Sequence, residues 1–284
     1  MVARGQIVLK SDADVAGLRA AASVVEQALA AAARLVRPGV PTDDLDAAAE
    51  AVIVGAGGRP AFKGYRMGGE GEPFPGSLCI SVNDVVVHGF PGPEPLREGD
   101  VVTLDCGVEL GGYFGDFAYT FAVGDVEPAT QALLDATRES LFAGIRVALG
   151  GNRVGDISSA VQRYCESRGY GVVRDLVGHG VGRSLHEAPN VPNAGRRGFG
   201  PKLKPGMTLC IEPMINGGTG DVVVDDDGWT VRTADGAPSA HYEHMVLIRR
   251  GQPEILSSWA AIEAAYAEAR AAWPVSVPVA STFA

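Results

Sequence analysis

The sequence predicts an α+β fold built from two similar halves. Two helical segments precede a group of short strand candidates, and this order occurs twice along the chain. With 284 residues, the chain is long enough for one large domain or two ordinary ones. Hydrophobic residues make up 46% and charged residues 20%, which are globular values, so disordered and disulfide-scaffold proteins are excluded. We therefore predict duplicated α+β halves around one sheet.

The first half opens with two helices. Ser11 begins an S-D-A-D segment that resembles a capping box, and the alanine-rich stretch after it runs to Arg37. Thr42 can cap a second helix, because its hydroxyl oxygen can accept from a free backbone N–H group, and this helix stops near Gly55. Glycine and proline dominate residues 60–76, which predicts a loop.

Strands complete the first half, and the pattern then recurs. Strands are predicted at 78–82 and 85–87, followed by a hairpin of 101–109 and 113–123 around Gly111-Gly112. The second half has helices at about 128–149 and 154–168, then strands at 208–215, 222–224, 229–232 and 242–248. A helix near 259–273 leads to a tail rich in proline, valine and serine. We expect residues 251–284 to be peripheral.

Charge and cysteine content limit the function classes. Lys and Arg number 24 and Asp and Glu 34, and the net charge of −10 disfavours a nucleic-acid-wrapping surface. The four cysteines form no C-x-x-C pair, so we interpret them as reduced cytosolic thiols. The first residues contain no signal-peptide apolar region, and no run reaches the ~18 apolar residues of a membrane span. We expect a cytoplasmic protein without a membrane or nucleic-acid partner.

The predicted hairpin brings two acids together. If its turn is centred between Leu110 and Gly111, Asp105 faces Asp116 across the two strands. Directly opposed side chains have Cβ atoms about 4.5–5.5 Å apart, so two carboxylates repel unless something positive lies between them. A metal ion is one explanation, while a shared proton, a nearby arginine or ordinary exposed carboxylates are others. A turn centred one residue later would change the pairing.

The histidines gather in a few short segments, VVVHGFP, VGHGVGRSLHEAP and SAHYEHM. His179 lies between two glycines, which permit the close backbone approach that a ligand needs. Glu212 and Glu243 lie in strand candidates among apolar neighbours, and an inward carboxylate must be paired or coordinated. Packed histidines and outward-pointing acids are the alternatives.

Together, five residues would make an oxygen-rich pocket with one imidazole: Asp105, Asp116, His179, Glu212 and Glu243. Four carboxylates carry about −4, which is too much for one divalent ion and well matched to two. Such ligands suit Mn, Fe(II) or Co, and Zn less obviously, since a structural zinc site would use thiolates. Two ions about 3.5–4 Å apart can hold a bridging hydroxide and polarise a carbonyl, which indicates hydrolytic chemistry.

Five segments resemble the motif blocks of type I methionine aminopeptidases: LCISVNDVVVHGFP, LDCGVELGGYFGDFAYTF, GHGVGRSLHEAPNVPN, GMTLCIEPM and SAHYEHMVLI. The blocks occur in order between Ser11 and Arg249. The resemblance implies a pita-bread fold, in which two pseudo-symmetric halves form a curved antiparallel sheet covered by helices. It implies one catalytic domain, 1–284, with its core at about 11–250.

The same resemblance implies an activity. Such an enzyme removes the initiator methionine from nascent polypeptide N-termini, prefers a small second residue, and uses a metal-bridging hydroxide as the nucleophile. It would be monomeric and cytoplasmic, with the ribosome as a place where it meets its substrates.

The family pattern assigns a role to each candidate ligand. Asp105 would chelate one ion, and Asp116 and Glu243 would bridge both. His179 and Glu212 would complete the second ion, with Glu212 also acting as general base.

Two further histidines match the substrate-contacting positions of the family. His88 and His186 would contact the substrate and stabilise the tetrahedral intermediate, as fixed donors to a developing oxyanion. His241 and His244 match no ligand, so we expect them to support the site or to be structural.

The family pattern also places the walls of a methionine pocket. These positions are occupied by Tyr65, Phe74, Cys79 and Trp229, although core packing is an alternative for Cys79 and Trp229. Two features depart from the pattern. The loop 66–73, RMGGEGEP, is longer than usual, and Leu185 stands where a larger side chain is common. We expect both to affect substrate selectivity rather than the metal chemistry.

Two alternative functions share much of this pattern. An Xaa-Pro aminopeptidase or dipeptidase would use the same ligands, but such proteins usually carry a sizeable N-terminal domain, whereas the residues before Asp105 already fill the first half. A non-catalytic peptide-binding protein of the same fold would have lost ligands, and all five are present here. The spacings of 33 and 31 residues between His179, Glu212 and Glu243 leave no room for the type II insertion.

Overall fold

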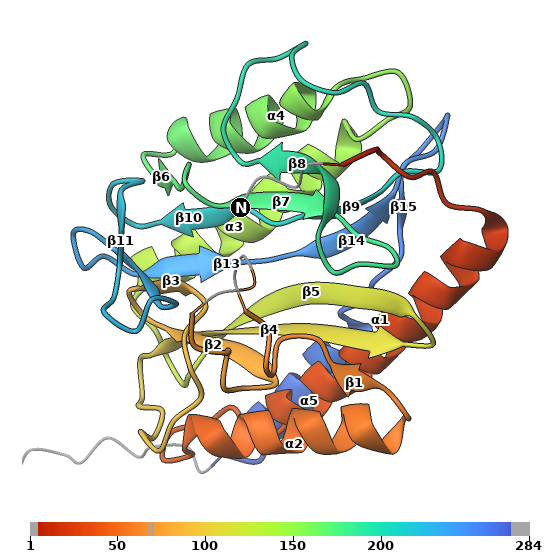
Figure 1. Cartoon of the computed structure of the whole chain (residues 1–284). Helices are drawn as coiled ribbons and strands as arrows, with labels where there is room; N and C mark the ends of the chain where they lie inside the picture. Colours follow the sequence, from red (N-terminus) through yellow and green to blue (C-terminus); the bar gives the residue numbers. More distant parts are fainter. Residues whose placement is uncertain (1–4, 67–68, 70, 274–284) are drawn as a thin grey trace, which may run out of the picture.

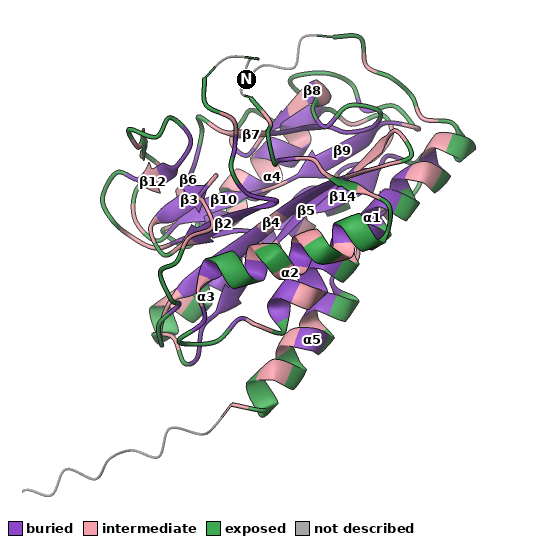
Figure 2. Ribbon diagram, turned by 60° about the horizontal axis from the view of Figure 1, so that its bottom comes forward, coloured by how far each residue is buried: buried purple, intermediate pink, exposed green. Residues whose placement is uncertain are grey.

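The computed structural model describes residues 5–66, 69 and 71–273. Helices cover the outside of a set of antiparallel strands, and two groups of elements form the two halves (Figure 1). Their buried faces point inward and their exposed faces outward (Figure 2). This arrangement agrees with the predicted α+β class and its duplication.

The first half has two helices over a four-stranded sheet. The helices are α1 (Asp12–Ala33) and α2 (Thr42–Gly55), and the strands are β1 (Arg59–Pro60), β2 (Leu78–Val82), β4 (Val101–Leu110) and β5 (Tyr113–Ala122). Gly115 of β5 allows α1 to approach this strand closely, because a Cβ on Gly115 would lie 2.6 Å from the backbone of Ala21. A side chain at Gly115 would therefore push the helix away from the strands.

The second half repeats this plan with more, shorter strands. Its helices are α3 (Pro128–Arg146) and α4 (Val154–Glu166). One sheet has the order β15 (Glu254–Ile255), β14 (His244–Leu247), β9 (Thr208–Ile211), β7 (Val177–Gly180) and β8 (Glu187–Pro192). A second has the order β13 (Ser239–His241), β10 (Met214–Asn216) and β6 (Gly171–Val172).

A fourth sheet, of three short strands, joins the two halves. It has the order β11 (Val222–Val224), β12 (Val231–Thr233) and β3 (Val85–Val87), so it combines a strand of the first half with two of the second. Hydrogen bonding therefore divides the strands of the described residues into four sheets, where the sequence predicted one. Two of the breaks between strands carry acids. Glu212 follows the end of β9, and Glu243 lies between β13 and β14.

The hairpin register differs from the first option considered. Gly111 and Gly112 both have positive φ, +59° and +79°, and form a two-residue turn with Leu110 paired to Tyr113. Asp105 therefore pairs with Ala118, and Asp116 pairs with Gly107. The direct Asp105–Asp116 pairing is wrong because the turn is centred one residue later. The two acids stay on one face of the sheet, offset by two residues.

Several predicted element ends also shift. Ser11 forms the expected capping box with Asp14, but α1 ends at Ala33. Thr42 is not the cap of α2: Pro41 holds that position, and the Thr42 hydroxyl instead donates to the carbonyl of Gly92 at 3.1 Å. The strand predicted over 208–215 is interrupted after Ile211, and the one over 242–248 starts at His244.

The C-terminal helix is more deeply integrated than the sequence indicates. Helix α5 (Ala260–Ala271) packs beside α1 (Figures 1 and 2). Trp259, Ile262 and Ala265 are buried in the main hydrophobic core, so this part of the segment expected to be peripheral is not. The predicted tail at 274–284 lies outside the described residues.

Within the residues that the structure describes, one helix is long and apolar enough to cross a membrane. It is α1, and 56% of its most apolar window is buried inside the protein. Its apolar residues Leu18, Val25 and Leu29 belong to the main core. Packing against the strands thus accounts for its apolar character.

Candidate metal centre and the adjoining pocket

The five candidate ligands line one cavity of about 550 Å³. Asp105 lies on β4, Asp116 on β5 and His179 on β7. Glu212 follows the last residue of β9, and Glu243 lies in the two-residue gap between β13 and β14. The structure therefore brings together, from both halves, side chains that are up to 138 residues apart in the sequence.

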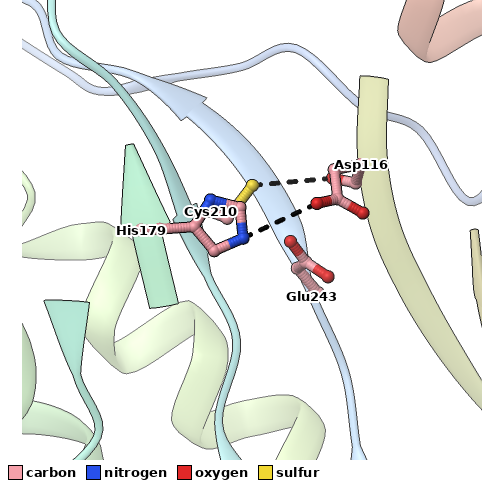
Figure 3. Close-up of side chains that lie close together, drawn as sticks. All are labelled: Asp116, His179, Cys210 and Glu243. Carbon is pink, nitrogen blue, oxygen red and sulfur yellow. Dashed lines mark hydrogen bonds and ion pairs between the residues drawn. The ribbon is translucent and has the colours of Figure 1, made fainter. Parts of the chain in front are cut away.

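His179 faces the carboxylates with an unprotonated nitrogen. Its Nδ1 atom lies 2.9 Å from the carbonyl oxygen of Gly180, and a carbonyl can only accept, so Nδ1 carries the proton. Its Nε2 atom lies 3.6 Å from Oδ2 of Asp116 (Figure 3). The same atom lies 3.5 Å from Oε1 of Glu212. A lone pair that faces two carboxylate oxygens is repelled unless a cation or a proton lies between them. This orientation is the one that metal-binding histidines adopt.

Burial makes it unfavourable to ionise the four acids, so their pKa values are raised. Burial raises the pKa of Asp105 to about 7. Burial, followed by the charges of neighbouring acids, raises the pKa of Asp116, Glu212 and Glu243 well above the ordinary values. Among the described residues, no lysine or arginine forms an ion pair with any of them.

Two buried carboxylate oxygens have no hydrogen-bond partner in the described part of the chain. They are Oδ1 of Asp105 and Oε1 of Glu243. A buried oxygen without a donor is costly. Four neighbouring acids in one cavity are rare unless a positive charge compensates them. The donor set, four carboxylates and one imidazole, fits divalent cations of the Mn, Fe and Co type.

Cys210 also lies in this cluster, and the sequence analysis did not select it. Potential ligand atoms of Asp116, His179, Cys210 and Glu243 all lie within 4.8 Å of one another (Figure 3). Burial, and then the charges of Glu243 and Asp116, raise the pKa of the thiol well above its ordinary value. The thiol therefore stays protonated and donates to the backbone carbonyl of Asp116, with Sγ and O 3.8 Å apart. Its position two residues before Glu212 was the available signal.

His88 and His186 both line the same cavity. His186 is near the rim, where its ring centroid is 4.4 Å from that of His179 and its Nδ1 is 3.2 Å from the hydroxyl oxygen of Tyr65. His88 has a φ of +59°, which is uncommon for a residue other than glycine and directs its side chain into the cavity. Burial, then the charge of His186, lowers the pKa of His88 to about 4, so the ring is neutral at pH 7.

An apolar pocket adjoins the acids. Its buried members pack as one cluster, with Tyr65 against them: Phe62, Phe74, Cys79, Leu185 and Trp229. The ring centroids of Phe74 and Trp229 are 5.3 Å apart, and Trp229 donates from Nε1 to the carbonyl of Glu72 at 3.0 Å. All the residues expected in the pocket are thus neighbours. Phe62 was missed, because nothing in its local sequence distinguishes it from other loop aromatics.

The two unassigned histidines have different surroundings. His241 lines the cavity, and neither of its ring nitrogens has a partner in the described residues. His244 points away from the cavity, and its Nδ1 lies 2.8 Å from Oγ of Ser257. Five further residues complete the wall, and no pattern in the sequence indicated them: Val87, Leu176, Val177, Asn190 and Met214.

Comparison with known proteins decides the family. Residues 16–250 match the model of metallopeptidase family M24. The chain belongs to this family. It is a metallopeptidase, and the resemblance seen in its motifs is confirmed.

Curated M24 relatives are similar over nearly their whole length. The methionine aminopeptidase of Clostridium perfringens is 49% identical over 251 residues, which are 88% of this chain and 98% of the relative. Methionine aminopeptidase 1 of Bacillus subtilis is 42% identical, with 88% of this chain and 99% of the relative covered. The M24 region therefore accounts for almost all of these relatives.

Solved structures of M24 enzymes confirm the pita-bread fold. Methionine aminopeptidases from Thermotoga maritima and Rickettsia prowazekii match with a TM-score of 0.85, at 40% and 37% identity. Each match covers 89% of this chain and 100% of the solved chain. A prolidase from Pyrococcus furiosus has a TM-score of 0.70 at 21% identity, and the match covers 65% of that chain, so this similarity concerns the fold alone.

Proposed function

We propose that this M24 chain is a methionine aminopeptidase that removes the N-terminal methionine from nascent polypeptides with a small second residue. One observation carries the proposal: a cluster of four buried or largely buried acids and one imidazole opens directly into an apolar pocket of aromatic rings and one thiol. Such a pocket suits an unbranched thioether side chain, since sulfur contacts aromatic rings favourably. The similarity to methionine aminopeptidases at 42–49% identity supports the same substrate.

The five ligands would hold two divalent ions. Asp105 would bind one ion, His179 and Glu212 the other, and Asp116 and Glu243 both. Mn, Fe(II) and Co are the preferred choices, with Zn as an alternative. When bound, such ions supply Lewis acidity toward a carbonyl and lower the pKa of water.

The chain's own residues would orient the substrate and move protons. The methionine side chain would enter between Tyr65, Phe74 and Trp229, which places the first peptide bond beside the acids. The carboxylate of Glu212 would accept the proton of the attacking water. His186 and His88, neutral at pH 7, would donate to the substrate carbonyl and to the developing oxyanion.

The surroundings of the reaction follow from the same proposal. Nascent N-termini emerge at the ribosome, so we expect the enzyme to act there as a cytoplasmic monomer. Glu72, near the end of the long loop 66–73, accepts from the indole N–H of the pocket residue Trp229, so we expect the loop to influence the second-residue preference.

The test is a metal-reconstituted peptidase assay. Protein stripped with EDTA is loaded with Mn²⁺ or Co²⁺ and offered Met-Ala-Ser, Met-Leu-Ser and Ala-Pro-Ser peptides. We expect release of methionine from Met-Ala-Ser, much slower release from Met-Leu-Ser, and no cleavage of Ala-Pro-Ser. Cleavage confined to the proline peptide would support an Xaa-Pro enzyme, and no cleavage of any peptide would support a binding protein. Asp226→Asn serves as a control for removing an acid from the protein. It changes an exposed acid outside the cavity, so we expect it to cleave the peptides as the wild type does.

A further inference from the structure

A C-terminal segment packs against the back of the candidate metal centre. The M24 model ends at residue 250, and the chain continues into β15 and α5. Ser257 and Trp259 lie between these two elements and contact residues around Glu243. We call residues 257–271 the C-terminal brace. No part of the brace lines the cavity, so it can act on the site only through other residues.

One ring contacts both chain neighbours of Glu243. Trp259 stacks on His244, with ring centroids 3.8 Å apart and an angle of 23° between the planes. It also contacts Tyr242, whose ring centroid is 5.5 Å away. Glu243 lies between these two residues, in the gap where β13 has ended and β14 has not begun. Trp259 therefore holds the residues before and after an acid that has no strand ladder of its own.

Ser257 adds hydrogen bonds to the same point. Its Oγ accepts from the backbone N–H of Met245 at 3.0 Å, which leaves its own hydrogen free to donate to Nδ1 of His244 at 2.8 Å. On the other side, the backbone N–H of Glu243 donates to the carbonyl of Ala118 on β5 at 3.2 Å. Glu243 is thus fixed between β5 in front and the brace behind.

The brace is itself anchored to both halves. At the N-terminal end of α5 the side chain of Trp259 forms no cap bond, but Oγ of Ser258 accepts from the Ala260 N–H at 3.1 Å. Glu26 of α1 in turn accepts from the Ser258 hydroxyl at 2.7 Å and from the Ala261 N–H at 3.0 Å. This carboxylate also suits the positive end of the helix dipole. Glu263 pairs with Arg138 of α3 at 2.6 Å, and Tyr266 donates to the carbonyl of Ala122. These contacts keep Trp259 in place.

We propose that Trp259 is a positioning residue that fixes the carboxylate of Glu243 for metal binding by holding Tyr242 and His244. The inference rests on the proposed function only in treating Glu243 as a metal ligand. Ligand geometry is sensitive to small displacements, and residues that orient a ligand typically change metal affinity about 10–100-fold when they are replaced. Without the ring, the two-residue gap loses the packing that takes the place of a strand ladder there.

The experiment compares Trp259→Ala and Trp259→Phe with a matched control, Ile262→Ala. Ile262 is fully buried on α5 and belongs to the same core, but it forms no ring contact with Tyr242 or His244. Phenylalanine keeps an aromatic ring and removes no hydrogen bond, because the indole Nε1 of Trp259 has no partner among the described residues. Mn²⁺ affinity is measured by calorimetry on EDTA-stripped protein, and thermal unfolding is recorded for each variant.

We expect Trp259→Ala to weaken Mn²⁺ binding about 10–100-fold, Trp259→Phe to stay within about threefold of the wild type, and Ile262→Ala to lower the melting temperature while binding Mn²⁺ normally. Unchanged affinity in Trp259→Ala overturns the proposal, as does an equal loss in Ile262→Ala. If Trp259→Ala does not fold, Trp259→Leu replaces it, because leucine fills part of the same space without an aromatic ring, and Mn²⁺ affinity equal to the wild type then overturns the proposal.

The outcome is separable from that of the proposed function. A wild type that binds Mn²⁺ but cleaves no methionyl peptide refutes the function, while the affinities of the variants still decide the role of Trp259. If the wild type cleaves Met-Ala-Ser and Trp259→Ala binds Mn²⁺ with equal affinity, the proposed function is supported and the positioning role of Trp259 is refuted.

Discussion

The two halves of the molecule present their acids to the cavity in different ways. In the first half, Asp105 and Asp116 lie inside long strands that pair continuously from Val101 to Leu110. In the second half, Glu212 and Glu243 lie just beyond strand ends, and His179 lies where the pairing of β7 with β8 shifts register. The first pair is held by a regular ladder, whereas the second set depends on contacts between distant segments.

Those distant contacts are clearest around Glu212. The backbone carbonyl of Glu212 accepts from Nδ2 of Asn193 at 2.9 Å. Gly178 lets β7 approach it, since a Cβ there would lie 2.5 Å from the carbonyl oxygen of Cys210 and 3.1 Å from Cγ of Glu212. In the second half, contacts between distant segments thus support the irregular backbone. In the first half, the regular pairing of strands has this role.

Removing one acid from each half is the strongest test of this comparison. Asp116→Ala and Glu243→Ala should each abolish hydrolysis of Met-Ala-Ser, by roughly 10³-fold or more, because each is expected to bind both ions and a metal Lewis acid contributes several kcal/mol. Peptide cleavage and bound metal are measured together. Near-wild-type turnover in either variant would contradict a centre shared by both halves.

A histidine at the rim should affect catalysis without affecting the metal. His186→Ala removes a donor to the substrate, so we expect turnover to fall about 10²-fold while the metal content stays unchanged. Elemental analysis of the purified variant provides the check. Loss of metal would mean that His186 is a ligand and that the assignment of this half is wrong.

Gly178→Ala addresses the irregular part of the second half. The added methyl group meets a backbone oxygen that cannot move away, so we expect a loss of about 1–3 kcal/mol in stability and about tenfold weaker Mn²⁺ binding through Glu212. Gly55→Ala is the control, since a Cβ there contacts nothing within 4 Å. Equal Mn²⁺ affinities in the two variants would show that the close approach at Gly178 does not position Glu212.

The acids of the first half also predict a pH effect in metal-free protein. The unfolded chain releases the Asp105 proton near the ordinary pKa of 3.8, but burial keeps it on the folded protein up to a pKa of about 7. Between these values the folded state binds more protons, so the contribution of Asp105 to the free energy of unfolding falls as pH rises.

Asp105→Asn has no such proton. In EDTA, its stability relative to the wild type should rise between pH 4 and pH 7, by roughly 1 kcal/mol or more. Urea unfolding of both proteins at pH 4 and pH 8 measures this, and a difference that does not change with pH would contradict the buried, protonated state of Asp105.

The smallest expected effect concerns the rim. Shortening the loop 66–73 should change the preference for the second residue, while metal content and Met-Ala-Ser turnover stay within a fewfold of the wild type. A peptide library with varied second residues provides the profile. An unaltered profile would remove the loop from the account of selectivity.

Features set by a few neighbouring residues were the ones that the sequence predicted. Helix ends with caps and the two-glycine turn are local features, and most of them were predicted within a few residues. The pairing of Asp105 was misplaced by two positions because a turn centred one residue later moves every partner. The strand breaks beside Glu212 and Glu243 were not predicted, although Pro213, which lacks an N–H donor, was a signal for one of them.

Other parts of the site could not be predicted because packing alone creates them. Cys210, Phe62 and Trp259 are apolar in character, and only the folded chain brings them against the acids, the pocket or His244. The motif blocks located the five expected ligands because these residues carry recognisable chemistry.

We propose that five side chains from two differently built halves hold a pair of divalent cations. An anomalous difference map from crystals soaked in Mn²⁺ would locate these ions. We predict two peaks about 3.5–4 Å apart, both contacted by Asp116 and Glu243, with Asp105 on one and His179 and Glu212 on the other. Peaks elsewhere in the molecule, or no peak between these side chains, would contradict the claim.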